Sequence, residues 1–170
     1  MNIDSQSSRT DDSVEQVFLK YSDTVFRIAY ARTNNSFDAE DIVQDVFCRY
    51  IRRKPQFQSQ EHEKAWFIRA ALNRTVSMMT SSWFKKTDAL QDDLSVTMEE
   101  KSEVYYAVAK LPSDMRVVVH LFYYEEYKVK EIAAILKKTE SSVKSILMRA
   151  RKKLAAQLRT ERDDFYEVSE

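Results

Sequence analysis

The chain of 170 residues contains no glycine and only two prolines, Pro55 and Pro112. Glycine is the residue that adopts left-handed backbone conformations most readily, so its absence removes tight Asn-Gly hairpins and glycine-rich phosphate loops. Proline is the strongest breaker of helices, and two prolines leave long uninterrupted segments. The sequence therefore favours an all-α fold and excludes the nucleotide-binding proteins that depend on a glycine-rich loop.

Three segments in the first half of the chain show apolar residues at helical spacing. The first helix is expected from Val14 to the Asn34–Ser36 break, the second from there to Pro55, and the third from about Glu63 to Lys86. The residues expected to be buried are Val14, Val17, Phe18, Tyr21, Val25, Ile28 and Ala29 in the first helix, Ile42, Val43, Val46, Phe47, Tyr50 and Ile51 in the second, and Ala65, Ile68, Leu72, Val76 and Met79 in the third.

The composition changes between Thr87 and Thr97, where acidic and polar residues replace large apolar ones. Helices are expected to resume over Met98–Lys110 and Asp114–Tyr124. We therefore expect an all-α protein of two small helical domains joined by a flexible linker. The expected boundaries are a disordered N-terminus at 1–12, a first domain at 13–86, the linker at 87–97, a second domain at 98–160 and an acidic tail at 161–170.

The segment Val129–Leu154 has the pattern of a helix-turn-helix. A short apolar helix is followed by a polar turn at Lys137–Thr139, and Glu140, Ser141 and Ser142 are residue types that open a second helix. In such a motif the second helix lies in the major groove of DNA. Ile132, Ala133, Ile135, Leu136, Val143, Ile146 and Leu147 are expected to be buried, which leaves Ser141, Ser142, Lys144, Ser145, Met148, Arg149 and Lys152 facing outward.

Basic residues concentrate in this segment. Between Lys128 and Leu154 nine basic residues face two acidic ones, a net charge of +7 in a chain whose formal net charge is zero. A basic helix end that complements its own dipole accounts for about two or three of these charges. An excess of this kind suits contact with phosphates, because each neutralised phosphate releases counterions. The segment is therefore predicted to bind DNA.

Two blocks of the sequence, 18–86 and 104–158, together resemble one family. The first contains FDAEDIVQDVFCRYIRR and AWFIRAALNRTVSMM, and the second contains LPSDMRVVVHLFYYEEYKVKEIAAIL and SSVKSILMRARKKL. In this order and spacing they resemble the extracytoplasmic-function (ECF) subfamily of bacterial RNA polymerase sigma factors. The resemblance implies a protein that binds core RNA polymerase and promoter DNA and directs promoter-specific initiation of transcription.

The resemblance also implies roles for three sets of residues. The acidic helix would dock on the clamp helices of the largest polymerase subunit, the loop and third helix would hold single-stranded bases of the promoter −10 element, and the second helix of the helix-turn-helix would read the −35 element. The polymerase-binding residues would be Asp38, Glu40, Asp41, Gln44, Asp45 and Arg49; the −10 residues Phe57, Trp66, Arg69, Asn73 and Arg74; and the −35 residues Ser141, Ser142, Lys144, Ser145, Met148, Arg149 and Lys152.

Two positions depart from the family pattern. Lys137 stands where the turn usually has glycine, and Ile146 stands where family members often have arginine. Lys137 must therefore adopt the turn without glycine's freedom, and Ile146 is expected to remove one DNA contact. In the linker, Asp88, Gln91, Asp92 and Asp93 either enter the polymerase cleft as a nucleic-acid mimic or form a plain spacer.

Catalysis is not expected. His62 and His120 lie in different blocks without a Cys, Asp or Glu at metal-ligand spacing, and Cys48 has no evident base partner. No cofactor or metal is predicted. A single cysteine excludes an internal disulfide and fits a reducing compartment. With no apolar run of membrane-spanning length and no signal peptide pattern, we expect a cytoplasmic protein without membrane insertion.

Three further possibilities follow from the same residues. The chain could be a stand-alone helix-turn-helix regulator that binds duplex DNA as a dimer, or a helical adaptor whose basic face serves only solubility. The family resemblance also implies an anti-sigma factor as a partner. The aromatic run Phe122–Tyr124 could contact such a partner, but we interpret it as part of the core.

Overall fold

The computed structural model describes the backbone of residues 4–80 and 102–167 and the side chains of residues 14–80 and 102–159. These residues form seven α-helices and no strand. The chain divides into two compact units, Met1–Gln91 and Asp92–Glu170. The predicted all-α fold with two helical domains is confirmed. The predicted linker at 87–97, with Asp88, Gln91, Asp92 and Asp93, lies outside the described residues.

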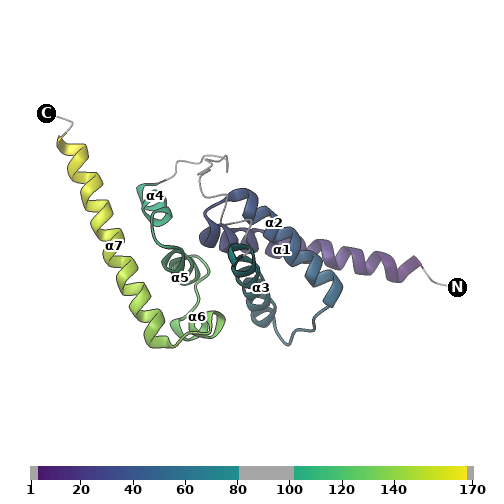
Figure 1. Ribbon diagram of the computed structural model, residues 1–170. Coiled ribbons are helices and arrows are strands. Elements are labelled where there is room, and N and C mark those ends of the chain that lie inside the picture. The colour runs from purple at the N-terminus through teal and green to yellow at the C-terminus, as the bar shows by residue number, and fades with distance from the viewer. Residues whose placement is uncertain (1–3, 81–101, 168–170) are drawn as a thin grey trace. The chain divides into compact units, whose positions relative to one another are not determined.

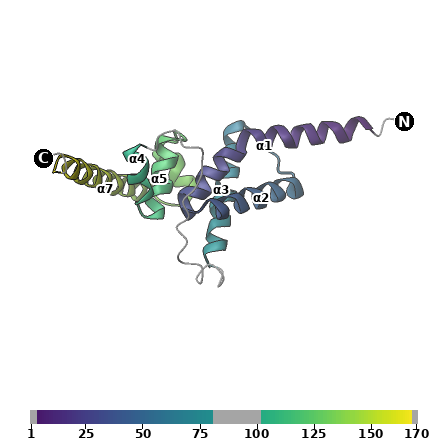
Figure 2. The same ribbon diagram turned by 90° about the horizontal axis from the view of Figure 1, so that it is seen from above.

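The first unit is a bundle of three helices that all pack on one another: α1 (Asp4–Thr33), α2 (Ser36–Arg53) and α3 (Gln60–Thr80). Figures 1 and 2 show the first part of α1 extending beyond the other two helices. The core lies where the three helices meet, and its largest fully buried side chains are Phe67, Ile28, Ile42, Ile68, Val25 and Val46.

Helix ends in this unit are formed without glycine. Asn34, with φ 55°, and Lys54, with φ 43°, adopt left-handed conformations after α1 and α2. Asn35 then caps α2, because its side-chain oxygen accepts a hydrogen bond of 3.1 Å from the Asp38 backbone N–H. Asparagine adopts the left-handed conformation and caps helix N-termini more readily than most residues. The break predicted at Asn34–Ser36 is therefore a single tight connection between two helices.

Helix α1 begins at Asp4, well before Val14. The expected disorder at 1–12 stays a prediction, and in the structure residues 4–12 continue the helix. The physical reason is that no proline or glycine lies between Asp4 and Thr33 to end it. Helix α3 also begins earlier than predicted, at Gln60 instead of about Glu63. Ser59 precedes it, and the Ser59 side-chain oxygen accepts a hydrogen bond of 3.1 Å from the His62 backbone N–H.

The buried face of α3 differs from the predicted one. Val76 is 51% exposed, and Leu72 and Met79 are only partly buried. Phe67 and Thr75 are fully buried instead. Ala65, Ile68, Ala70 and Ala71 complete the buried face. In α1 and α2 the predicted core is correct at its centre, but Val14, Val17, Phe18, Val43, Tyr50 and Ile51 remain partly or largely exposed.

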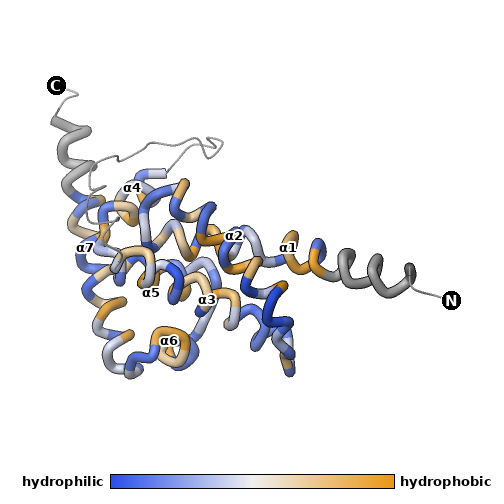
Figure 3. Tube along the Cα trace, turned by 45° about the vertical axis from the view of Figure 1, so that its right-hand side comes forward, coloured by the Kyte–Doolittle hydropathy of each residue, from blue (hydrophilic) through white to orange (hydrophobic). Residues whose placement is uncertain are grey.

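The second unit contains α4 (Glu103–Ala109), α5 (Ser113–Tyr123), α6 (Val129–Leu136) and α7 (Glu140–Glu167). Helix α7 packs against each of the other three, and its last turns extend beyond them (Figure 1). In Figure 3, α6 is coloured mainly as hydrophobic, whereas hydrophilic and hydrophobic residues alternate along α7. Its largest fully buried side chains are Leu111, Val117, Val118, Leu121, Ile132 and Val143.

Two predictions for this unit change. The helix expected over Met98–Lys110 spans Glu103–Ala109 in the structure, with Ser102 as its N-terminal cap, and residues 98–101 lie outside the described residues. The aromatic run is not core: Tyr123 is 51% exposed and Tyr124 is 58% exposed. Both follow the buried Leu121 at the C-terminal end of α5. None of the helices in the described ranges is long and apolar enough to cross a bilayer.

Candidate nucleic-acid interface

The helix-turn-helix forms where it was predicted, with α6 and α7 joined by Lys137–Thr139. Lys137 has φ 52° and ψ 45°, a left-handed conformation in which its backbone N–H donates to the Ala133 carbonyl. The Lys138 N–H donates to the same carbonyl at 2.9 Å. The N-terminal cap of α7 is Thr139, whose hydroxyl oxygen accepts a hydrogen bond of 3.1 Å from the Ser142 N–H. The cap therefore lies one residue before the predicted Glu140–Ser142.

A Lys137→Gly substitution is expected to stabilise the second unit. A side chain in the left-handed region costs about 1–2 kcal/mol, and glycine's larger entropy loss on folding offsets part of the relief. We expect a net gain of about 0.5–1 kcal/mol, measured by amide hydrogen exchange in α6 and α7. Lys138→Gly is the control, because Lys138 has no positive φ and should lose stability. Equal behaviour of the two variants would contradict the argument.

Helix α7 separates a buried face from an exposed one. Val143, Ile146, Leu147 and Ala150 are buried against the unit. Ile146 is only 6% exposed, so its side chain packs in the core of the unit, and the expected loss of a DNA contact at this position stays a prediction. The predicted outward residues Ser141, Lys144, Ser145, Met148, Arg149 and Lys152 are exposed, and Ser142 is half-buried.

Arg151, although exposed, is oriented by α5. Its Nε donates a hydrogen bond of 2.7 Å to the Tyr123 hydroxyl, and its guanidinium carbon lies 5.5 Å from the centre of the Phe122 ring. A guanidinium near an aromatic face is attracted by the ring quadrupole. Part of the basic charge predicted to contact DNA therefore holds α7 against α5, a role that the sequence pattern did not indicate.

In the first unit, five of the six residues predicted on the acidic face of α2 are exposed: Glu40, Asp41, Gln44, Asp45 and Arg49. The sixth, Asp38, is partly buried. Burial raises the pKa of the Asp38 carboxyl above its ordinary value, and the neighbouring Asp41 carboxylate raises it further. Carboxylates kept together at an electrostatic cost are a feature of functional sites. This face can accept a cationic partner, which would relieve the repulsion.

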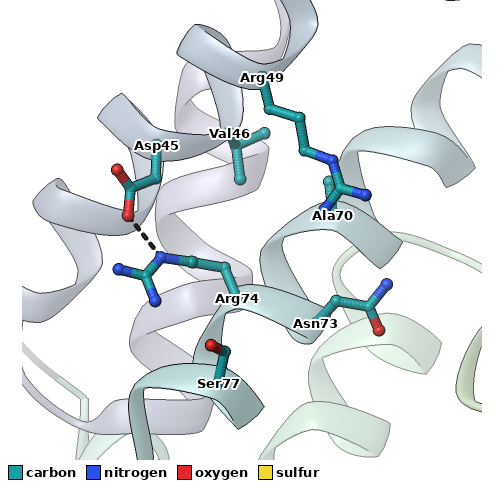
Figure 4. A pocket seen from close by; sticks show the side chains of 7 residues that line it. All are labelled: Asp45, Val46, Arg49, Ala70, Asn73, Arg74 and Ser77. Carbon is teal, nitrogen blue, oxygen red and sulfur yellow. Dashed lines mark hydrogen bonds and ion pairs between the residues drawn. The ribbon is translucent and has the colours of Figure 1, made fainter. Parts of the chain in front are cut away.

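A hollow of about 160 Å³ lies between α2 and α3 (Figure 4). Arg74 turns toward Asp45, and the two side chains form an ion pair. The structure thus brings Asp45 and Arg49, predicted to bind polymerase, next to Asn73 and Arg74, predicted to bind DNA. The residues that line the hollow are Asp45, Val46, Arg49, Ala70, Asn73, Arg74 and Ser77.

Phe57 and Trp66 also come together, and both rings are partly exposed. Their centres are 5.9 Å apart with an edge-to-face geometry. Trp66 contacts Tyr50 and the buried Phe67, so its inner side belongs to the packing while the ring remains accessible. Arg69, one turn along α3, is exposed. Aromatic faces beside cations are the chemistry that holds unpaired bases.

The start of α3 is tied to α1 by a hydrogen bond that sequence reasoning missed. The Tyr21 hydroxyl donates to the Glu63 carboxylate at 2.7 Å, and Lys20 Nζ lies 3.4 Å from the same oxygen. The Tyr21 ring is stacked on Phe67 with centres 4.7 Å apart. The only sequence signals for this contact are the position of Tyr21 on the buried face of α1 and the acidic Glu63 in the first turn of α3. It holds the helix start that follows the Phe57 loop.

Tyr21→Phe is expected to destabilise the first unit by about 1 kcal/mol at neutral pH, since it removes one hydrogen bond and keeps the stacked ring. Burial raises the pKa of the Tyr21 phenol, as does Glu63, against the opposing effect of Lys20. The stability that depends on the protonated phenol is therefore complete below about pH 10 and is lost as pH rises through the raised pKa. The free energy of unfolding of the Tyr21→Phe variant should therefore change less with pH in this range.

Urea unfolding followed by tryptophan fluorescence measures this effect, because both tryptophans, Trp66 and Trp83, lie in the first unit. Tyr106→Phe, in the second unit, is the control. Wild-type stability of the Tyr21→Phe variant at pH 7 would show that the hydrogen bond contributes nothing.

The described residues offer no site of metal chemistry. No group of three or more His, Cys, Asp or Glu side chains that could hold a metal ion occurs among them. His62 packs on Phe57, His120 Nε2 lies 3.4 Å from the Glu125 carboxylate, and Cys48 is exposed on α2.

Comparison with known families matches both units. Residues 17–84 match the model of sigma-70 region 2, and residues 101–154 match that of sigma-70 region 4. The two models together cover well over half of the chain.

Curated relatives are similar over most of their length. The chain is 27% identical over 159 residues to the ECF RNA polymerase sigma factor SigM of Bacillus subtilis, covering 85% of this chain and 94% of the relative. It is also 27% identical over 162 residues to SigW of the same organism, covering 82% of this chain and 85% of the relative.

Solved structures share the fold. One is the sigma factor RpoE from Bartonella quintana in complex with the anti-sigma factor NepR, with a TM-score of 0.67, 21% identity and coverage of 85% of this chain and 96% of the other. Another is CnrH in complex with the cytosolic domain of CnrY, with a TM-score of 0.63, 23% identity and coverage of 88% and 90%.

Proposed function

The chain belongs to the ECF subfamily of RNA polymerase sigma factors, and on that premise we propose which of its surfaces carries each step of transcription initiation. The family is not enzymatic; its members direct initiation by RNA polymerase. The observation that carries the proposal is that each unit has its own buried core and its own exposed interface. The first unit would bind polymerase and the opened −10 strand, and the second would bind the −35 duplex.

The exposed side of α2 is the proposed polymerase-binding surface. It carries Glu40, Asp41 and Gln44 in exposed positions, with Asp38 beside them. The electrostatic cost of placing Asp38 near Asp41 supports a partner with basic groups, because such a partner lowers the energy of both carboxylates. A basic face on the polymerase would complement this helix.

The hollow between α2 and α3 and the adjacent aromatic pair form the proposed −10 surface. Phe57 and Trp66 would stack on bases, while Arg69 and Arg74 would neutralise phosphates. Asn73 offers an amide that can donate to and accept from a base edge. The hollow places Asp45 and Arg49 at the same surface, so we assign these two residues to both partners. Opening of the Arg74–Asp45 ion pair would free the guanidinium for a phosphate.

The outward face of α7 is the proposed −35 surface. Lys144, Arg149 and Lys152 supply cations, and Ser141, Ser142 and Ser145 supply short hydroxyl groups that leave room for close approach to the groove. The exposure of this face and the burial of the opposite one support this assignment.

Transcription in vitro tests the proposal. The full chain is added to core RNA polymerase on a promoter library, and selected promoters should be transcribed only in its presence. The control is core polymerase alone on the same templates. Absence of stimulation on every template would overturn the assignment.

Duplex binding by the isolated chain, measured without polymerase, separates the stand-alone regulator from the sigma factor. The helix-turn-helix face is complete within the second unit, which is the observation that favours a regulator. A regulator would bind a palindromic or repeated duplex tightly without polymerase. A sigma factor requires polymerase for specific promoter use, so strong specific binding by the isolated chain would favour the regulator.

We also propose an anti-sigma factor as a partner and the cytoplasm as the location. Two proteins of similar fold are described in complexes with an anti-sigma factor or a cytosolic domain. Exposed apolar side chains are present in both units, among them Phe18, Leu19, Tyr123 and Tyr124. A protein that co-purifies in equal amounts and abolishes the in vitro transcription would support this partner, whereas a co-purifying protein without effect would not.

A further inference from the structure

Met148 is the most exposed large apolar side chain that the structure describes in the second unit. It is 65% exposed, on a helix whose other large apolar residues in the first three turns, Val143, Ile146 and Leu147, are buried. An isolated exposed apolar residue needs no explanation by itself. For Met148, the neighbouring side chains and its position on the helix do provide an explanation.

Met148 lies on the side of α7 opposite the buried face. A helix turns by about 100° per residue, which places Ser145 one turn before Met148 and Lys152 one turn after it on the same side. Ser141 lies two turns before Met148. On the N-terminal side the serines are short and leave the thioether exposed, and the exposed Lys144 lies one turn before Met148 on the same side. That half of a recognition helix is the part that reaches base edges.

The neighbouring arginines are directed along or away from this side. Arg149 Nε donates to the Ser145 carbonyl of its own helix at 3.3 Å, and Arg151 is held by Tyr123. Met148, in the middle of the exposed face, is apolar and cannot donate a hydrogen bond.

Among the groups that base pairs present in the major groove, the apolar one is the C5-methyl of thymine. Methionine is flexible and polarizable, which allows it to follow the position of a methyl group. We propose that Met148 contacts the C5-methyl of a thymine in the upstream duplex and thereby sets a base preference at that position. The inference depends on the proposed role of α7 in −35 binding.

Deoxyuridine substitution tests the contact. A promoter that the polymerase with this chain transcribes is prepared with each upstream thymine replaced in turn by deoxyuridine, which removes only the methyl group. At one position wild-type open-complex formation should fall about four-fold, the factor expected for one methyl group left unburied. With Met148→Ala the thymine and deoxyuridine templates should perform equally, and Met148→Leu should restore a difference.

The outcomes distinguish this inference from the proposed function. Dependence on the upstream element without any deoxyuridine effect would overturn the methyl contact and leave the role of α7 intact. An equal loss on thymine and deoxyuridine templates with Met148→Ala would also overturn it, because Met148 would then act through another partner such as polymerase. Loss of all dependence on the upstream element would overturn both.

Discussion

Phe67→Ala is expected to lower the stability of the first unit by about 3–5 kcal/mol, the usual cost of deleting a buried phenylalanine. Phe67 is fully buried, and its ring centre lies 4.7 Å from Tyr21, 5.1 Å from Phe47 and 5.3 Å from Tyr50. The substitution therefore removes the contact shared by all three helices. Since a small domain has about 5–15 kcal/mol of stability, most of it would be lost.

Urea unfolding followed by tryptophan fluorescence gives the measurement, and Val76→Ala provides the matched control. Val76 is on the same helix but is 51% exposed, so its truncation should change stability by less than about 0.5 kcal/mol. The second unit has its own core and should keep its helical structure in the Phe67→Ala variant. A larger loss from Val76→Ala than from Phe67→Ala would show that the predicted face of α3, and not the described one, is buried.

The pair Phe67 and Val76 shows why the core of α3 could be predicted only in part. Periodicity identified the helix, but apolar residues occur on more than one side of it. Trp66 and Phe67 are adjacent, and only Phe67 is fully buried, because it contacts Tyr21 and Phe47 from two other helices. That information lies in the packing and not in the local pattern.

The helix-turn-helix was predicted more accurately because its large apolar residues, apart from Met148, occupy one side. Val143, Ile146 and Leu147 define a single buried face, and the outward face follows from it. What the pattern could not provide is the proximity of separate helices. The hollow that joins Asp45 with Asn73 and the orientation of Arg151 by Tyr123 both depend on tertiary structure.

Arg149→Ala combined with Lys152→Ala is expected to reduce use of promoters with a −35 element by a factor on the order of 30 to 10⁴. Each cation that contacts a base edge contributes about 1–3 kcal/mol to discrimination. If both contact phosphates instead, the slope of log affinity against log salt concentration should fall by about two. Both side chains are exposed on α7, so the fold should be unaffected. Open-complex formation with core polymerase at several salt concentrations distinguishes the two kinds of contact.

The control is Lys153→Ala combined with Arg159→Ala, which removes the same charge from exposed positions of the same helix outside the proposed contact set. If net charge alone governed promoter binding, the two double variants would lose activity equally. If the outward face of α7 reads the duplex, the loss belongs to Arg149 and Lys152, and a base contact changes the ranking of templates as well as their overall use. Unchanged promoter use and unchanged salt dependence in the Arg149/Lys152 variant would exclude these two residues from the interface and would require the −35 element to be bound by another surface of the second unit.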